Sequence, residues 1–224
     1  MATYIDGLNQ YYQYQGIGPL TCPVNWAPAW AFNPEEGVLD RPEFQPAGVP
    51  QTRTPEGAAA IHSRYQTIDG VLHRSFPVGI GEGVRASVYM MKEQPEDGHA
   101  MQIGIDPTGG ASFLDERVVW SNWYSQFDTG YWSPGAWVLR GVDAIAESNI
   151  ITVFLRSKVD VPTEGSHAHF DDFQLVTSGV VPPDPPDPPD PPDGTLGDLL
   201  GAIEDAVSAA VEYVDQNAVQ ALIV

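Results

Sequence analysis

Hydrophobic and polar residues alternate with a period of two in several short segments of the chain. The clearest is 84–92 (VRASVYMMK), in which Val84, Ala86, Val88 and Met90 share one face. Successive side chains of a β-strand point to opposite sides, so this pattern predicts a strand with one buried face. Further strands are predicted at 58–66, 70–78, 100–106, 117–121 and 136–144.

Two more strands are predicted at the end of the patterned region. Residues 150–156 (IITVFLR) form a β-branched and apolar run too short for a full helix. A loop at 158–165 follows, and then a strand at 168–176. The alternation places Phe170, Asp172, Gln174 and Val176 on one face of that strand, and His169, Asp171, Phe173 and Leu175 on the other.

These eight or nine strands, with no convincing helix between them, predict an all-β fold for residues 1–180. Their regular spacing is typical of an antiparallel β-sandwich of the jelly-roll kind. Residues 1–20 are predicted to form one short strand and a loop. Residues 21–57 carry seven prolines, which exclude a central strand or a long helix and predict a long ordered loop. Such loops are usually functional.

A stalk is predicted at 181–194, where residues 182–193 read PPDPPDPPDPPD. Such a run adopts the polyproline II helix, at about 3.1 Å per residue, and reaches roughly 37 Å as a semi-rigid rod. The chain lacks the glycine at every third position that a collagen triple helix requires.

Residues 195–224 are predicted to form an amphipathic α-helix, with Thr195 as its N-cap. An isolated helix with an apolar stripe is unstable in water, so the stripe must be buried on copies of itself, on a partner protein or on the sandwich. The residues predicted to oligomerise or dock are Leu196, Leu200, Ile203, Val207, Ala210 and Val214.

Charge and composition exclude several classes of function. The formal net charge is −20, which disfavours binding to nucleic acid and to anionic lipid. No stretch reaches the roughly 18 apolar residues that span a bilayer, and the single cysteine, Cys22, excludes an internal disulfide. The N-terminus has no ordinary signal peptide. We therefore expect a chain made in the cytoplasm and active on a virion surface or outside the cell.

Two tryptophans on the Pro-rich segment, Trp26 and Trp30, are candidates for sugar binding. An exposed indole stacks on the apolar face of a sugar ring, while neighbouring polar groups bind its hydroxyls. The alternative is that both side chains pin the segment to the sandwich. Trp137 shares a strand face with Leu139 and is expected in the core.

Two metal sites are conceivable near the end of the sandwich. His167, His169 and Asp171 alternate on one strand face and could bind a transition metal such as zinc, or else lie at the rim and hydrogen-bond a loop. Asp171 or Asp172 could bind calcium with backbone carbonyls from the N-terminal segment, or be a simple strand-edge carboxylate. The two aspartates point to opposite faces of a regular strand, which argues against a glycosidase pair. No nucleophile or nucleotide-binding motif is found.

Several motifs resemble those of galactose-binding-like jelly rolls of the carbohydrate-binding-module type. They are VNWAPAW, LDRPEF, AIHSRYQ, QIGIDPTGG, VVWS, ITVFLRS and HFDDFQL, within residues 18–176. The resemblance implies a five-plus-four-stranded sandwich, no catalysis, and a glycan ligand or none. It also implies polar binding residues, expected to meet near Trp26 and Trp30: Arg41, Glu43, His62, Gln66, Gln102, Asp106 and His169.

The favoured hypothesis is a non-enzymatic display protein, with a glycan-binding head on a stalk that the C-terminal helix anchors to its own copies or to a virion protein. A leaderless, disulfide-free, acidic module fits a phage head fibre, decoration protein or tail adhesin. The alternatives are a secreted or cell-surface carbohydrate-binding module of a glycan-degrading system, a cementing protein without a ligand, and a metal-dependent enzyme using His167, His169 and Asp171.

Overall fold

The computed structural model describes residues 2–13, 21–31, 41–47, 52–53, 57–63, 67–92, 99–125, 137–161 and 166–180. The chain divides into two units, Met1–Val181 and Pro182–Val224. The predicted polyproline stalk and C-terminal helix, with all six residues of its seam, lie outside the described residues. None of the described residues forms a helix able to cross a membrane.

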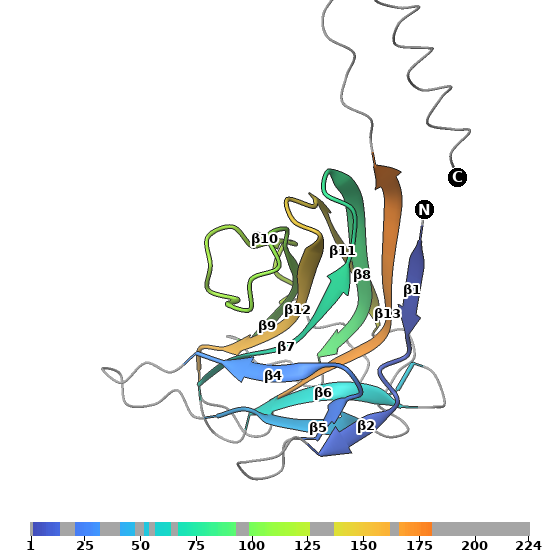
Figure 1. Ribbon diagram of the computed structural model, residues 1–224. Helices are drawn as coiled ribbons and strands as arrows, with labels where there is room; N and C mark the ends of the chain where they lie inside the picture. Colours follow the sequence, from blue (N-terminus) through green and yellow to red (C-terminus); the bar gives the residue numbers. More distant parts are fainter. Residues whose placement is uncertain are drawn as a thin grey trace, which may run out of the picture. The chain divides into compact units, whose positions relative to one another are not determined.

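The described part of the chain is built from antiparallel β-strands, as predicted (Figure 1). The larger layer, called the six-stranded sheet, runs in the order β11-β8-β13-β6-β5, and β1 also pairs with β13. Its strands are β11 (Val138–Ile145), β8 (Glu82–Lys92), β13 (Ser166–Val180), β6 (Ala58–Ser63), β5 (Glu43–Ala47) and β1 (Thr3–Asp6).

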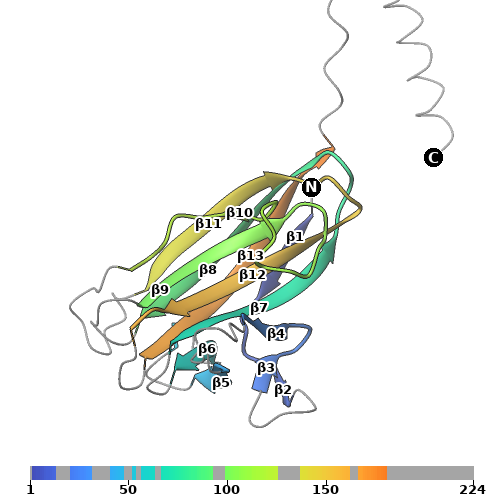
Figure 2. The same cartoon turned by 90° about the vertical axis from the view of Figure 1, so that its left-hand side faces the viewer.

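The second layer, called the five-stranded sheet, runs in the order β10-β9-β12-β7-β4. Its outer side faces the viewer in Figure 2. Its strands are β10 (Val119–Trp120), β9 (His99–Asp106), β12 (Ile150–Val159), β7 (Ile68–Pro77) and β4 (Ala27–Trp30). A separate pair is formed by β2 (Tyr11–Gln13) and β3 (Thr21–Pro23).

The main hydrophobic core lies between these two sheets. In β8 the predicted inner face is confirmed, because Val84, Ala86, Val88 and Met90 are all buried in the core. In β9 and β12 the inward residues likewise alternate with outward ones. The inward residues of those two strands are Met101, Ile103, Ile105, Ile151, Val153 and Leu155.

The prediction of one long loop over 21–57 is wrong, because this region contributes β3, β4 and β5. Pro28 lies in β4 and Pro46 in β5, and both strands end the order of their sheets. Proline has no N–H to donate, so it is tolerated in an edge strand although it would break the ladder of a central one. The prolines therefore correctly excluded central strands, but they did not exclude edge strands.

A β-bulge in β13 overturns the predicted faces of that strand. The pairing of β13 with β8 shifts register between Asp171 and Gln174, and Asp172 adopts a φ of 50°. Because one extra residue is inserted, Phe170 and Phe173 both point into the core, and neither is exposed. A regular strand would have placed these two side chains on opposite faces.

Trp26 belongs to the core, so the prediction of an exposed Trp26 is wrong. Its side chain is 0% exposed and meets the Phe173 ring edge-on at 5.1 Å between centroids. Its indole N–H donates to the Asp6 carboxylate over 3.1 Å, and Arg74 donates to the same oxygen over 2.7 Å. The contacts match the alternative in which Trp26 pins its segment to the sandwich.

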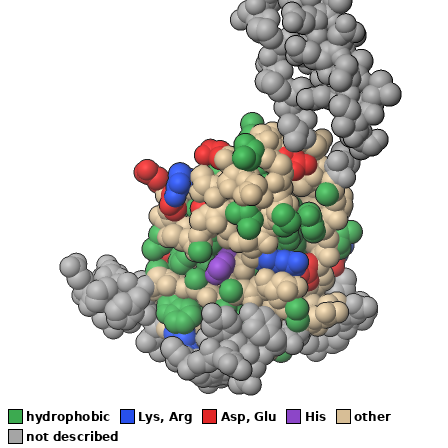
Figure 3. Space-filling model, in the orientation of Figure 1, with side chains coloured by type: hydrophobic (Ala, Val, Ile, Leu, Met, Phe, Trp, Pro, Cys, Tyr) green, Lys and Arg blue, Asp and Glu red, His purple; other side chains and the backbone are tan. Residues whose placement is uncertain are grey.

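Trp137 and Leu139 lie on the outer face of the six-stranded sheet, so the expected core position is wrong. Leu139 is 51% exposed, and Trp137 is half-buried against Ala47, Ala58 and Ala60. Apolar side chains elsewhere on the surface are dispersed among polar ones, as the visible face in Figure 3 shows.

Candidate functional site

The outer face of the five-stranded sheet carries a group of aromatic and charged side chains. Because Met101, Ile103 and Ile105 of β9 point inward, Gln102 and Gly104 point outward. The same alternation directs Phe154 and Arg156 of β12 outward, beside Asp69 and His73 of β7. The segment between β9 and β10 lies on this side of the sheet (Figure 1).

Arg156 lies at the centre of this group. Its guanidinium carbon is 5.2 Å from the ring centres of both Trp120 and Trp123, and 5.3 Å from that of Phe113. Its Nε and Nη2 donate to the two carboxylate oxygens of Asp69 over 2.7 and 2.6 Å. A planar guanidinium suits both stacking and a two-point contact with a carboxylate, so this side chain is held firmly.

Trp120 lies flat against the backbone of β9. A Cβ added to Gly104 would come within 2.4 Å of the indole carbon Cε3, so only glycine leaves room for the ring. The Trp120 ring also lies 6.0 Å from Phe154, which in turn is 5.9 Å from His73. The rings therefore form a continuous layer across β10, β12 and β7.

Part of this layer faces solvent. Trp123 is 43% exposed, and Trp120 and His73 are partly exposed, whereas Phe113, Val118 and Phe154 are buried beneath and beside them. Burial lowers the pKa of His73, which favours the neutral imidazole at physiological pH. We call the exposed set and its polar neighbours the aromatic–arginine face: Asp69, His73, Gln102, Trp120, Trp123 and Arg156.

The aromatic–arginine face combines the two kinds of contact that a sugar ring requires. An indole offers an apolar surface for the C–H groups of the ring. The Arg156 side chain, 13% exposed, offers N–H donors, whereas Asp69 and Gln102 are buried beside it. Gln102 lies directly opposite Arg156 in the β9–β12 pairing.

Of the predicted binding residues, Gln102 is the one that belongs to this face. Asp106 ends the same strand, but its Oδ1 accepts hydrogen bonds from the backbone N–H and the hydroxyl of Thr108, at 2.8 and 2.7 Å. Through these bonds Asp106 stabilises the turn that follows β9. Trp30 ends β4 on the same sheet and is partly buried against the main core.

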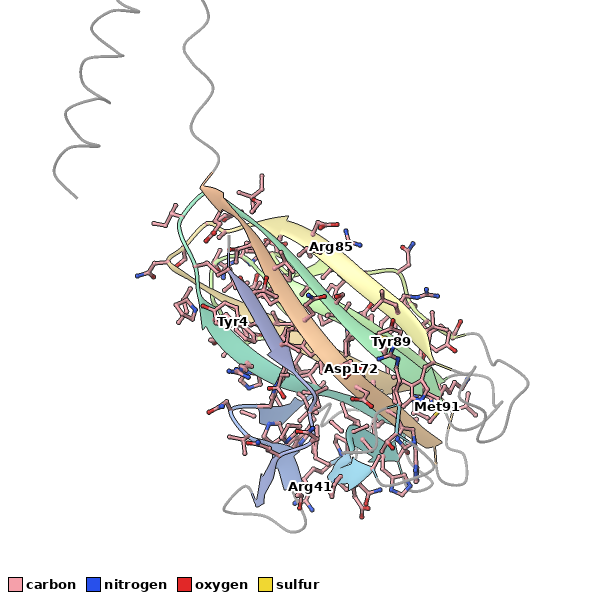
Figure 4. The ribbon with its side chains drawn as sticks, turned by 90° about the vertical axis from the view of Figure 1, so that its right-hand side faces the viewer. Tyr4, Arg41, Arg85, Tyr89, Met91 and Asp172 are labelled. Carbon is pink, nitrogen blue, oxygen red and sulfur yellow. The ribbon has the colours of Figure 1, made fainter. Side chains whose placement is uncertain are left out.

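Three other predicted residues lie together on the six-stranded sheet. Glu43 pairs with His62 across β5 and β6, with 3.4 Å between the carboxylate Oε2 and the imidazole Nδ1. His169 follows on β13, and both histidines are buried. Arg41 precedes β5 (Figure 4), and Gln66 lies outside the described residues. The structure therefore divides the predicted site between the two sheets.

The predicted metal-binding groups are engaged with protein atoms. Asp171 is buried and accepts hydrogen bonds from the backbone N–H groups of Arg53 and Asp172, at 2.9 and 2.7 Å. Asp172 forms an ion pair with the Arg53 side chain. Among the described residues, no group of three or more His, Cys, Asp or Glu side chains is arranged to hold a metal ion. Calcium binding at Asp171 or Asp172 stays a prediction.

The sequence analysis missed most of the aromatic–arginine face. Trp120 lies in a predicted strand and Trp123 follows three residues later, a spacing that by itself says nothing of exposure. The usable signal was the outward glycine in Gln102-Ile103-Gly104, which leaves a gap that a large ring can fill. Asp69 and Arg156 are 87 residues apart in the chain, so only the sheet topology reveals their pairing.

No protein-family model matches the chain, and no curated protein matches it. Among solved structures, the K1 cleaved adhesin domain of Lys-gingipain from Porphyromonas gingivalis W83 has a TM-score of 0.51 and 11% identity, covering 80% of this chain and 100% of that one. TmCBM61 in complex with β-1,4-galactotriose has a TM-score of 0.46 and 13% identity, covering 68% and 88%. The CBM22-1 xylan-binding domain of Paenibacillus barcinonensis Xyn10C has a TM-score of 0.44 and 15% identity, covering 70% and 88%. The likeness to the adhesin domain shows a shared fold.

Proposed function

We propose that the sandwich is a non-catalytic glycan-binding domain and that the aromatic–arginine face is its binding site. The observation that carries this proposal is the position of Arg156 among three aromatic rings, two of which are partly exposed tryptophans. Buried arginine–carboxylate pairs are common, but this one is bordered by indole surface open to solvent. Such a surface suits a ring-shaped ligand with one apolar face.

Preorganisation favours binding by this face. The Asp69–Arg156 pair is largely buried, with side chains 9% and 13% exposed. Gly104 and Phe154 hold Trp120 in place. A ligand would therefore meet side chains that are already ordered, and little conformational entropy would be lost on binding.

The carboxylates of this face favour binding over hydrolysis. Glycosidases commonly use two carboxyl groups flanking the scissile bond, about 5 to 9.5 Å apart. Within the aromatic–arginine face as described, Asp69 is the one carboxylate, and both of its oxygens accept hydrogen bonds from Arg156. An ionised group committed in this way is poorly placed to act as a general acid.

We further propose that this head is displayed on the Pro-Pro-Asp stalk and anchored by residues 195–224 to copies of itself or to a virion protein, as in a phage head fibre, decoration protein or tail adhesin. The repeat composition and the apolar seam support this context. Co-purification of the full chain with phage particles would support it. Association with a polysaccharide-degrading enzyme would instead indicate a secreted or cell-surface carbohydrate-binding module.

A glycan array followed by calorimetry on the best ligand tests the binding site. Trp123→Ala should weaken binding at least tenfold, about 1.4 kcal/mol, because it removes the most exposed ring of the face. Trp137→Ala is the matched control, since it removes a half-buried tryptophan on the outer face of the opposite sheet.

Two outcomes would contradict this assignment. Unchanged affinity in a folded Trp123→Ala protein would show that the ligand binds elsewhere. A failure of the parent protein to bind any glycan on the array would contradict the proposed function itself and favour a cementing protein without a ligand.

A further inference from the structure

Four of the five histidines in the chain gather at one end of the sandwich, away from His73 of the aromatic–arginine face. His62 of β6 lies opposite His167 of β13, with ring centres 3.8 Å apart. The His167 and His169 ring centres are 5.7 Å apart. His99 begins β9 in the other sheet. We call these four residues the histidine cluster, of which three belong to the six-stranded sheet and His99 to the five-stranded sheet.

His99 is the most enclosed member of the histidine cluster. It is 1% exposed, and its Nε2 lies 3.1 Å from the Ser157 hydroxyl of β12. Its Nδ1 is buried and has no hydrogen-bond partner among the described residues. Lys92, the last residue of β8, is buried at the same end and places a positive charge near His99.

We propose that His99 is an acid-sensitive latch: as an enclosed neutral imidazole it keeps this end of the sandwich closed, and acid favours opening because the opened chain can take up a proton that the enclosed ring cannot. Protonation of His99 in the closed state would place a positive charge near the ammonium group of Lys92, in a site with little access to water. Like charges in such a site repel strongly because the surroundings screen them poorly.

The energetics of His99 give the direction of the effect. Burial, followed by the charges of Lys92, His169 and His167, lowers the pKa of His99 to about 3. The unfolded chain takes up this proton near its ordinary pKa of 6.5, whereas the folded chain resists it. His99 therefore does not change the stability above about pH 6.5. Below that pH the ratio of folded to unfolded protein falls by about tenfold for each pH unit.

Acidic groups also lie at this end among the described residues, including Asp160, which forms an ion pair with Lys158 of β12. Glu43 of β5 lies 3.4 Å from His62, between the carboxylate Oε2 and the imidazole Nδ1. Asp171 of β13 accepts hydrogen bonds from two backbone N–H groups. The charged and titratable groups acting on His99 from β8 and β13 are Lys92, His167 and His169, all of which oppose its protonation. His99 is therefore the group on which the latch depends.

Urea unfolding of the full chain between pH 7.5 and pH 5 tests the latch. The parent protein should lose stability over this interval. His99→Gln cannot be protonated yet retains a donor for Ser157, so its loss should be clearly smaller. His73→Gln is the matched control and should leave the pH slope closer to that of the parent. Equal slopes for the parent and His99→Gln would overturn the proposal, as would equal flattening by both variants.

Titration of the histidine ring protons by NMR gives a second test, and its first part uses the parent protein alone. The His99 signal of the parent should show no protonation at pH 5. Lys92→Met removes the neighbouring charge and should raise the pKa of His99 toward its usual value. A His99 signal that titrates near pH 6.5 in the parent protein would refute the latch.

Discussion

At the residue scale, the packing of neighbouring side chains decides which residue type fits at a position. Gly104 is required because Trp120 occupies the position of a side chain, and Trp26 is required because its buried ring packs against those of Phe76 and Phe173. Neither requirement follows from the residue type. Trp26 on a Pro-rich segment and Trp123 after a strand look equally exposed in the sequence, yet the first is core and the second is surface.

Gly104→Ala should destabilise the fold and disturb the aromatic–arginine face. The added methyl group would overlap the Trp120 ring, and such overpacking typically costs about 1–3 kcal/mol. Urea unfolding measures the loss, and tryptophan fluorescence reports the displacement of the ring. Gly83→Ala is a suitable control, because there the nearest atom is the hydroxyl of the flexible Ser178 side chain. A Gly104→Ala protein as stable as the control would contradict this account of Trp120.

At the scale of elements, strand positions were predictable and strand irregularities were not. The alternation in β8 is readable in the sequence because one face of this strand is buried against the opposing sheet. The bulge in β13 leaves no such pattern, since Phe170 and Phe173 are three residues apart and a regular strand forbids their sharing a face. Proline content likewise marked β4 and β5 as unsuited to the interior of a sheet but not as edge strands.

The bulge predicts different costs for two substitutions at Asp172. Both Asp172→Gly and Asp172→Val remove the ion pair with Arg53. Only valine is strained at a φ of 50°, at a cost of about 1–2 kcal/mol. The valine variant should therefore unfold at a lower urea concentration than the glycine variant. Equal midpoints would indicate that the backbone at this position relaxes to an ordinary strand conformation.

At the scale of the whole molecule, the sequence predicted the all-β antiparallel class but not the division of candidate residues between sheets. Glu43 and Gln102 both resembled binding residues, yet they belong to opposite layers. Layer assignment depends on strand order, and the order β11-β8-β13-β6-β5 joins segments from distant parts of the chain. The pattern of hydrophobic and polar residues along a strand does not indicate the order of the strands in a sheet.

The predicted C-terminal helix leads to a prediction of the mass of the protein in solution, which can be measured. Its apolar seam, from Leu196 to Val214, should self-associate if copies of the chain are its partner. Light scattering should then show a defined oligomer for the full chain and a monomer for a version ending at Val181. If both are monomeric, self-association is excluded, and the seam must be buried on another protein or on the sandwich.

The central position of β13 has a mechanical consequence. This strand is hydrogen-bonded to β8 on one side and to β6 and β1 on the other, and the chain continues from it beyond Val180. Tension applied through the C-terminal part of the chain would pull β13 along its own axis. Its ladder bonds would then bear the load together in shear rather than open one after another, because this strand is paired on both of its sides.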